Sequence, residues 1–397
     1  MALDHDIAIV GGGPAGIATA LTIAQLAPDL LGRLVVIEKA RFPRDKYCAG
    51  GLGGRGDRIL ARLGTVPDVP SVTIDGMSLR LSAGDVEAQA GTTIGRVVRR
   101  LEFDHTLATM AMGRGVRIVE GTKVETVGAL GAELGAVVRT SDGELTARIV
   151  VGADGVGSAV RRSMGLSRGR LRAQVLELDT EPVDADVSRT TLRFDASDRG
   201  FNGYQWDFPT LVDGCPMVSR GIYNLRVVDE DSDIRSILAR RLGRLGLSID
   251  DYRLKRFAER GFDLHEPLAL GPLMLVGEAA GIDPITGEGI AQALEHGWMA
   301  GQFIIDCLAG YCAPSAWTDR VRRSRLARDL SLRRRAVAAF YGPRRPALER
   351  FLLDYPAVLH LGCRHFGDLP YNRMTLLRVA SAGLWRWVRR DQIASPS

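Results

Sequence analysis

The sequence predicts a mixed α/β fold with three parts: a Rossmann-like domain, an antiparallel β-sheet inserted into it, and a helical C-terminal region. Three observations predict this arrangement. Residues 7–10 form an apolar run that passes through glycines into an apolar helix and a second apolar run, which is the strand, turn, helix and strand order of an α/β domain. Residues 180–224 alternate polar and apolar side chains between turn signals, as antiparallel strands do. From residue 317 onward the spacing is helical and amphipathic.

Apolar runs define the elements of the Rossmann-like part. In chain order we expect strands over 7–10 and 34–37 around a helix over 17–26, strands over 116–127 and 145–151, and a strand over 273–276 leading into a helix over 289–308. The segment from 42 to 56 is rich in glycine and arginine and has no periodicity. This composition favours a functional loop over a linker.

Length and composition restrict the class of protein. The 397 residues suffice for two to three domains, and 46% hydrophobic with 25% charged residues is usual for soluble globular proteins. Disordered and fibrous classes are therefore excluded. A membrane-spanning helix needs about 18 consecutive apolar residues, and no stretch of the sequence approaches this. No basic and then apolar leader segment precedes the first strand, so we expect a cytoplasmic protein. Five irregularly spaced cysteines fit a reducing compartment.

The net charge of +5 is concentrated near the C-terminus. Residues 321–390 hold sixteen arginines against four acidic residues, a local charge of +12. Trp385 and Trp387 stand among these arginines. This pattern suits peripheral contact with an anionic membrane, while nucleic acid is disfavoured as a partner. A helical face that simply points to water explains the same charge, and is the default interpretation.

The clearest motif is a glycine-rich turn between the first strand and the first helix. Gly11 to Gly16 form a GxGxxG fingerprint, and Glu38 ends the next strand 22 residues after Gly16. Such glycines permit a tight turn, close approach of a pyrophosphate to the helix N-terminus and close packing of helix on strand, and the acid accepts ribose hydroxyls. The expected dinucleotide contacts are Gly11, Gly13, Pro14, Ala15, Gly16, Glu38 and Lys39.

Two later motifs point to FAD rather than NAD. Val150 to Gly155, followed by Ser158 and Arg161, resembles the GADG element of the FAD-dependent aromatic hydroxylases and their relatives. Leu275 to Gly281 and then Gly287 to Ile290 resemble the second flavin element of that superfamily, with Glu278 where Asp is usual. Val98 to Asp104 resembles its R-x-x-F-D element. The resemblance implies FAD contacts from Gly50, Arg100, Asp154, Gly155, Gly277, Glu278, Gly287, Gly289 and Ile290.

Within this superfamily the sequence is most similar to the geranylgeranyl reductase group. Phe42 to Gly51 resembles the group's cysteine- and glycine-rich flavin loop, and Gly203 to Pro209 resembles its Y-x-W-x-F-P motif. The resemblance implies that Cys48 lies near the flavin ring at the mouth of a lipid tunnel. Tyr204 and Trp206 would share one strand face and form an aromatic wall. Core packing is the alternative for all three side chains.

The resemblance also implies the domain boundaries and the fold type, which is glutathione reductase-like. A discontinuous FAD-binding domain would take 1–75, 96–170 and 263–310. The substrate-binding β-sheet domain would take 76–95 and 171–262, and residues 311–397 would form the arginine-rich helical region. No metal site is expected, because His360, Cys363 and His365 lack the spacing of a known ligand set.

The implied function is an FAD-dependent oxidoreductase that reduces carbon–carbon double bonds of a hydrophobic, prenyl-type or specialised-metabolite substrate. Reduced flavin would deliver hydride from N5, and an acid such as Cys48 or Tyr204 would supply the proton. Electrons would come from NAD(P)H, ferredoxin or a separate reductase, since no second dinucleotide-binding unit is evident. The alternatives are a flavin monooxygenase using NAD(P)H and oxygen, a non-redox cyclase using reduced flavin, and a basic-tail membrane or nucleic-acid binder with a vestigial flavin site.

Overall fold

A computed structural model describes residues 3–131, 135–226, 233–283 and 287–371, together with residues 374, 377 and 381. Trp385, Trp387 and the arginines around them, on which the membrane expectation depends, lie outside the described residues. Among the described helices, none is long and apolar enough to cross a membrane.

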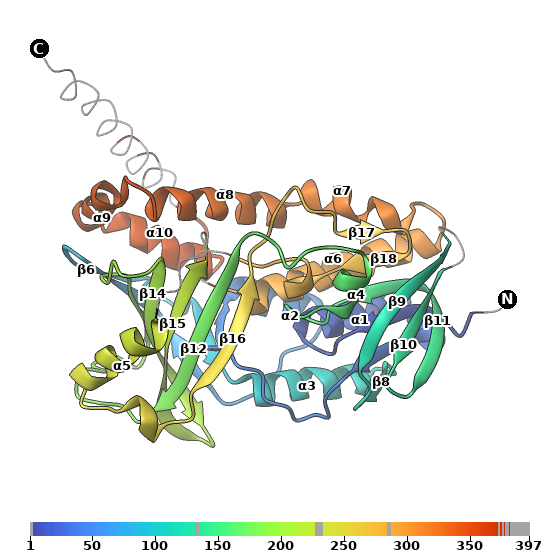
Figure 1. Cartoon of the computed structure of the whole chain (residues 1–397), viewed down its shortest axis with the longest axis horizontal. Helices are drawn as coiled ribbons and strands as arrows, with labels where there is room; N and C mark the ends of the chain where they lie inside the picture. Colours follow the sequence, from blue (N-terminus) through green and yellow to red (C-terminus); the bar gives the residue numbers. More distant parts are fainter. Residues whose placement is uncertain are drawn as a thin grey trace, which may run out of the picture.

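The Rossmann-like part is built on an eight-stranded sheet (Figure 1). Its main path runs β17-β18-β11-β1-β2-β8, and β9 and β10 extend from β11 as antiparallel strands. β1 pairs in parallel with both β2 and β11, and β18 continues the parallel order on β11. The strand bounds are β1 His5–Val10, β2 Leu34–Glu38, β8 Arg117–Glu120, β9 Val124–Gly131, β10 Gly135–Thr140, β11 Gly143–Gly152, β17 Ala269–Leu270 and β18 Leu273–Leu275.

Two helices of this part pack closely and run in the same direction. A Cβ on Gly297 of α6 (Ile290–Leu308) would lie 2.2 Å from the carbonyl oxygen of Ala15 in α1 (Pro14–Leu26), and one on Gly301 would lie 2.5 Å from Cβ of Thr22. Only glycine permits this approach of one helix backbone to the other. Since the contacts advance together along both helices, the N-termini of α1 and α6 lie at the same end of the sheet.

The second sheet has seven strands in the order β16-β12-β15-β14-β13-β5-β6. All its pairings are antiparallel except that of β13 with β5. Its bounds are β5 Gly76–Leu81, β6 Gly84–Gln89, β12 Arg172–Thr180, β13 Thr191–Asp195, β14 Gly203–Val212, β15 Cys215–Arg226 and β16 Lys255–Arg260. The sequence prediction of antiparallel strands over 180–224 is thus confirmed. A small sheet of β3 (Gly51–Gly53), β7 (Gly95–Val98) and β4 (Ser71–Ile74) lies beside it.

The C-terminal helices span both parts (Figure 1). α7 (Trp317–Arg322) and α8 (Arg325–Phe340) run from the side of β17 and β18 towards the second sheet, where α9 (Arg345–Asp354) and α10 (Ala357–Phe366) lie near β6. The other helices are α2 Gly54–Arg62, α3 Arg100–Gly113, α4 Ala159–Ser163 and α5 Ile234–Arg244, with 3₁₀ turns at Pro28–Arg33, Ile249–Asp251, Gly277–Ala279 and Pro314–Ala316.

Two arginines of the C-terminal helices differ from the expectation of a face that points to water. Arg333 and Arg345 are largely buried, and both are ion-paired to carboxylates. Arg345 contacts Glu349 at 2.8 Å, and Glu349 also pairs with Arg199 of the second sheet's loop at 3.1 Å. Buried carboxylates need such partners, because an unpaired buried charge is costly. Arg333 pairs with Asp283 and Glu288 outside α8, and Arg345 donates to the carbonyl oxygen of Ala196, so these arginines dock the helices onto the body of the protein.

One strand boundary also differs from the expectation. The sequence predicts an extended segment over 116–127, but β8 ends at Glu120 and β9 begins at Val124. Gly121 between them has φ +77°, a left-handed conformation that glycine adopts at no steric cost. The chain turns at this glycine and enters the antiparallel extension of the sheet.

Candidate active site

The three flavin-type motifs, far apart in the sequence, touch one another in the structure. A Cβ on Gly11 would lie 2.4 Å from the carbonyl oxygen of Ala153, in the second motif. One on Gly277, in the third motif, would lie 2.7 Å from Cβ of Ala15, in the first. One on Gly155 would lie 3.5 Å from Oε2 of Glu278, which joins the second motif to the third. The glycines therefore permit one compact site at the end of β1 and β11.

The N-terminus of α1 faces an open space bounded by two guanidinium groups. Gly13 caps the helix, and Pro14 begins it. A Cβ on Gly13 would meet only Nη2 of Arg44 at 3.8 Å and Nη2 of Arg100 at 3.9 Å. These are ordinary van der Waals distances, so the protein itself does not require glycine here. A helix N-terminus facing two arginines is a suitable site for a pyrophosphate.

Glu38 lies buried at the end of β2, next to the glycine-rich turn. Its Oε2 accepts a hydrogen bond from the N–H of Gly12 at 2.8 Å, and its Oε1 accepts one from Ala40 at 3.0 Å. Oε1 keeps capacity for another donor, so the placement fits the expected ribose contact. Lys39, by contrast, is exposed.

Arg44 and Asp104 belong to this site, although the sequence analysis assigned them no role. Arg44 reaches Glu38 at 3.5 Å and Asp104 at 3.0 Å, while Asp104 holds Arg100 through two contacts of 2.6 Å. Nε of Arg44 is buried and has no hydrogen-bond partner among the described residues. The position of Arg44 inside the glycine- and arginine-rich loop is the feature of the sequence that could have indicated its role in this site.

Asp154 provides a second polar atom without a partner. Its Oδ2 accepts the N–H of Ala159 at 2.6 Å at the start of α4, but its Oδ1 is buried and lacks a partner among the described residues. Burial raises the pKa of this carboxyl. Together with the space at Gly13, these unused polar atoms fit an FAD whose phosphates would lie at the N-terminus of α1.

The remaining expected contacts surround the inner end of this site. Gly50 has φ +81°, and a Cβ there would lie 2.0 Å from the carbonyl oxygen of Val98. Glu278 forms an ion pair with Lys46 at 3.0 Å. Gly287 has φ +64°, while Gly289 caps α6 and Ile290 begins it. The N-terminus of α6 thus points to the same region as that of α1.

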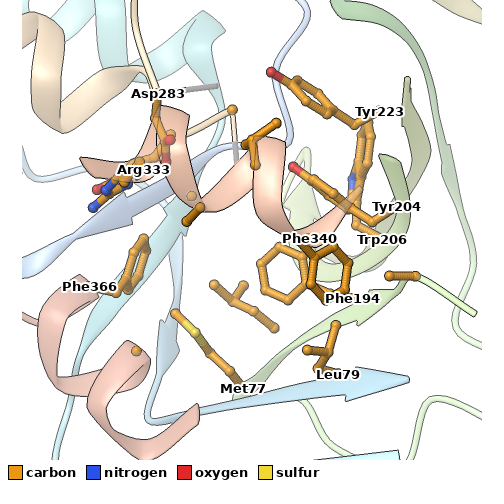
Figure 2. Close-up of a pocket in the computed structure, with 18 of the residues that line it drawn as sticks. Met77, Leu79, Phe194, Tyr204, Trp206, Tyr223, Asp283, Arg333, Phe340 and Phe366 are labelled. Carbon is orange, nitrogen blue, oxygen red and sulfur yellow. Dashed lines mark hydrogen bonds and ion pairs between the residues drawn. The ribbon is translucent and has the colours of Figure 1, made fainter. Parts of the chain in front are cut away.

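Beyond these residues lies a cavity of about 640 Å³. The second sheet forms one wall, and α8, α9 and α10 form the opposite one. The lining is almost entirely apolar, and in Figure 2 Asp283 and Tyr223 lie at one end, whereas Met77 and Leu79 lie at the other. The cavity is also lined by residues from the loops of the cofactor site: Cys48, Ala49, Gly50, Gly51, Gly287 and Gly289. The size is that of a small-molecule pocket.

Tyr204 and Trp206 contribute to the cavity wall, as the alternation on β14 predicts. Their ring centroids are 6.3 Å apart, and Tyr204 stacks on Tyr223 at 5.2 Å (Figure 2). Nε1 of Trp206 donates to Oγ of Ser219 at 3.3 Å. Burial raises the pKa of Tyr204 and of Tyr223 well above the usual value, so both stay uncharged.

Cys48 lies between two spaces of opposite character. It lines the apolar cavity, and also a small polar pocket that contains Glu177 and Lys255. Its Sγ accepts the N–H of Gly50 at 3.4 Å. Burial raises the pKa of the Cys48 thiol, although Arg100 opposes the shift. The thiol is therefore neutral where the cofactor loop meets the cavity.

The contribution of the C-terminal helices to the cavity was missed by the sequence analysis. Arg333, Phe340 and Phe366 line it from α8 and α10 (Figure 2). Arg333 pairs with the buried Asp283 and, at 3.2 Å, with Glu288. The amphipathic spacing of these helices is visible in the sequence, but nothing in the sequence shows which surface the apolar faces of the helices cover.

This fold and site define a flavoprotein of the oxidoreductase class. A family model described as "FAD binding domain" matches residues 4–328. The chain belongs to this family, and it is an FAD-dependent oxidoreductase.

Known relatives cover most of the chain. It is 29% identical to a digeranylgeranylglycerophospholipid reductase of Methanocella arvoryzae, over 78% of this chain and 79% of that protein. It is also 29% identical to a menaquinone reductase of Mycobacterium tuberculosis, over 82% and 83%. A geranylgeranyl bacteriochlorophyll reductase-like structure from Thermoplasma acidophilum has a TM-score of 0.74 at 22% identity, covering 91% of this chain and 95% of that one. A p-nitrophenol 4-monooxygenase of Pseudomonas putida shares the fold, with a TM-score of 0.70 at 18% identity over 92% and 99%.

Arg44→Gln should weaken FAD binding without unfolding the protein. A charge-assisted hydrogen bond contributes about 1.5–3 kcal/mol, and Arg44 lies at the edge of the phosphate space, so we expect a rise in Kd of about tenfold or more. Titration of apoprotein with FAD measures it. Arg80→Gln, an exposed arginine paired with Asp85, is the control. An unchanged Kd would remove Arg44 from the cofactor site.

Proposed function

We propose that the protein reduces carbon–carbon double bonds of a long, hydrophobic, prenyl-type substrate. The observation that carries the proposal is the apolar cavity of about 640 Å³, which Cys48 and Gly287 line and which extends in Figure 2 from Tyr223 to Leu79. An apolar chain gains about 25 cal/mol per Å² of surface that it buries in such a cavity. The reductase names of the curated relatives support this chemistry.

The residues of the chain bind, orient and shield the reactants. FAD, when bound, supplies two-electron reduction chemistry. Arg44, Arg100 and the N-terminus of α1 hold its phosphates, and Asp154 and Glu278 lie along its expected path. Cys48 and the rings of Tyr204 and Trp206 confine the substrate beside the cofactor loop. Because an unactivated double bond offers little electronic help, this positioning must provide much of the rate.

The cavity favours reduction over oxygen chemistry on a polar aromatic. Its charged side chain Arg333 forms ion pairs with both Asp283 and Glu288, and its far end is made of Met77 and Leu79 (Figure 2). A phenol would leave much of this apolar volume of about 640 Å³ unfilled. For the electrons, we propose NAD(P)H or a separate donor such as ferredoxin or a reductase.

An anaerobic reaction tests the proposed function. Protein loaded with FAD is reduced chemically in the absence of oxygen and mixed with a long-chain prenyl alcohol, and products are measured by mass spectrometry. We expect a gain of two hydrogens for each double bond reduced. A product that forms only with oxygen, and that contains an oxygen atom from it, would instead identify a monooxygenase.

Leu79→Trp should restrict the protein to shorter substrates. Leu79 lines the far end of the cavity, so a larger ring there removes room for the end of a long chain. We expect turnover of long prenyl alcohols to fall by roughly tenfold relative to short ones, since each methylene in a pocket is worth about 1–3 kcal/mol. FAD content should stay unchanged. Leu332→Trp, on the exposed face of α8, is the control, and equal loss on short and long substrates would contradict the assignment.

A further inference from the structure

The cavity contains one carboxyl group that the proposed function has not used. Glu259 lies on β16 and lines the cavity, as does Phe257 two residues before it. Phe257 pairs in register with Val175 of β12, which lines the cavity too. Side chains two residues apart on a strand share one face. Glu259 therefore stands on the cavity face of the second sheet.

The carboxyl group of Glu259 lies at the cofactor-side end of the cavity. Its Oε2 would be 2.9 Å from a Cβ on Gly287, the glycine of the loop that leads into α6. That Cβ would also lie 3.0 Å from the ring of Tyr223. Oε2 is buried and has no hydrogen-bond partner among the described residues. A polar atom without a partner is thus placed where the cofactor loop meets the substrate cavity.

Burial and the neighbouring charges favour the protonated form of Glu259. Burial raises the pKa of this carboxyl well above 4.5, and the negative charge of Glu278 raises it further. Asp283 and Glu177 act in the same direction, and Lys46 opposes them. Tyr204 and Tyr223, also close by, are uncharged. A neutral carboxylic acid donates a proton, which a carboxylate cannot do.

We propose that Glu259 is the proton donor of the double-bond reduction, an inference that rests on the proposed function. Saturation breaks the π bond and forms two C–H bonds. One carbon receives a hydride from reduced FAD, the two-electron reductant, which is left oxidised. The other carbon receives the proton of Glu259, whose O–H bond breaks. Glu259 remains as a carboxylate until a proton returns from solvent.

Glu259 carries the most acidic type of group among the three candidate donors, since a carboxylic acid has a reference pKa of about 4.3, against about 8.5 for a thiol and about 10 for a phenol. Burial raises the pKa of Glu259, of Cys48 and of Tyr204 alike. The proton therefore comes from β16, whereas Cys48 and Tyr204 confine the substrate.

Glu259→Gln tests the step, because glutamine keeps the shape and the neutral charge of the protonated acid. The variant should keep its FAD, while the single-turnover rate of the reduced, anaerobic enzyme with a long-chain prenyl alcohol should fall by about 10²–10⁴-fold. Glu87→Gln, an exposed residue of β6, should have no effect. A wild-type rate in Glu259→Gln overturns the proposal, as does a large loss in Tyr204→Phe alone.

The apoprotein gives a second readout that needs no turnover. A carboxyl whose pKa is raised by folding binds more protons in the native state than in the unfolded state, so it costs stability as pH rises from 4.5 towards the folded pKa. The folding equilibrium constant of the wild type relative to Glu259→Gln should fall about tenfold per pH unit in that window. The folding equilibrium constant of the wild type relative to that of Glu87→Gln should stay constant over the same pH range.

The two readouts separate this inference from the proposed function. A wild type that reduces no double bond contradicts the proposed function, and the stability ratio then still decides whether Glu259 is a neutral acid. If the folding equilibrium constant of the wild type relative to Glu259→Gln stays constant from pH 4.5 to about 8, the carboxyl of Glu259 is ionised in the native state. This result would overturn the proton-donor assignment.

Discussion

Gly13→Val should yield a folded protein that no longer binds FAD. The space beside Gly13 lies between the N-terminus of α1, Arg44 and Arg100, and a Cβ would meet the two guanidinium groups at 3.8 and 3.9 Å. The free protein therefore tolerates a side chain that a bound pyrophosphate does not. Overpacking costs about 1–3 kcal/mol and the phosphate contacts are lost as well, so we expect Kd for FAD to rise by about a hundredfold or more.

The measurement combines bound FAD per chain with the melting temperature of the apoprotein. Gly128→Val is the matched control, because a Cβ at this β9 position meets nothing within 4 Å and valine suits a strand. Gly16→Val should behave differently from both and lose stability as well as FAD, since its Cβ would lie 1.9 Å from the carbonyl oxygen of Gly11. Full FAD content in Gly13→Val would be incompatible with the assigned phosphate site.

The cofactor half of the molecule could be predicted because its signals are local. A glycine-rich turn between a strand and a helix demands a particular backbone path, and Gly11 and Gly16 are fixed by contacts with backbone atoms of 2.4 and 1.9 Å. Glu38 could be predicted in the same way, because an acidic residue that ends the second strand of such a unit is recognised from its position alone. The antiparallel sheet followed in the same way from the period of two along β14 and β15.

The cavity half could be predicted only in part, because it depends on contacts between distant segments. Tyr204 and Trp206 share a face of β14, which alternation alone reveals. Glu259 occurs in a strand whose neighbours Arg256 and Ala258 are exposed, so its sequence resembles an ordinary surface strand. Which wall α8 and α10 provide depends on ion pairs such as Arg333 with Asp283, and no local pattern encodes that pairing.

Cys48→Ala should keep FAD and lose most of its turnover. The thiol lies at the boundary between the cofactor loop and the cavity, so its removal opens space where the proposed substrate would meet the cofactor loop. A misplacement of about 1 Å there costs about a hundredfold in rate, and we expect a loss of that size in single-turnover reduction. A residue with only a packing role would instead cost about 1–3 kcal/mol of stability and leave the rate intact.

Cys363→Ala separates these two roles for Cys48. Cys363 is fully buried, and its Sγ contacts the carbonyl oxygen of Ala88 at 3.6 Å, but it does not line the cavity. Its truncation should lower the melting temperature and leave the rate per bound FAD unchanged, whereas Cys48→Ala should lower that rate with a smaller change in melting temperature. If both variants lower only the melting temperature, Cys48 is a core residue, and the reacting carbon lies elsewhere along the cavity.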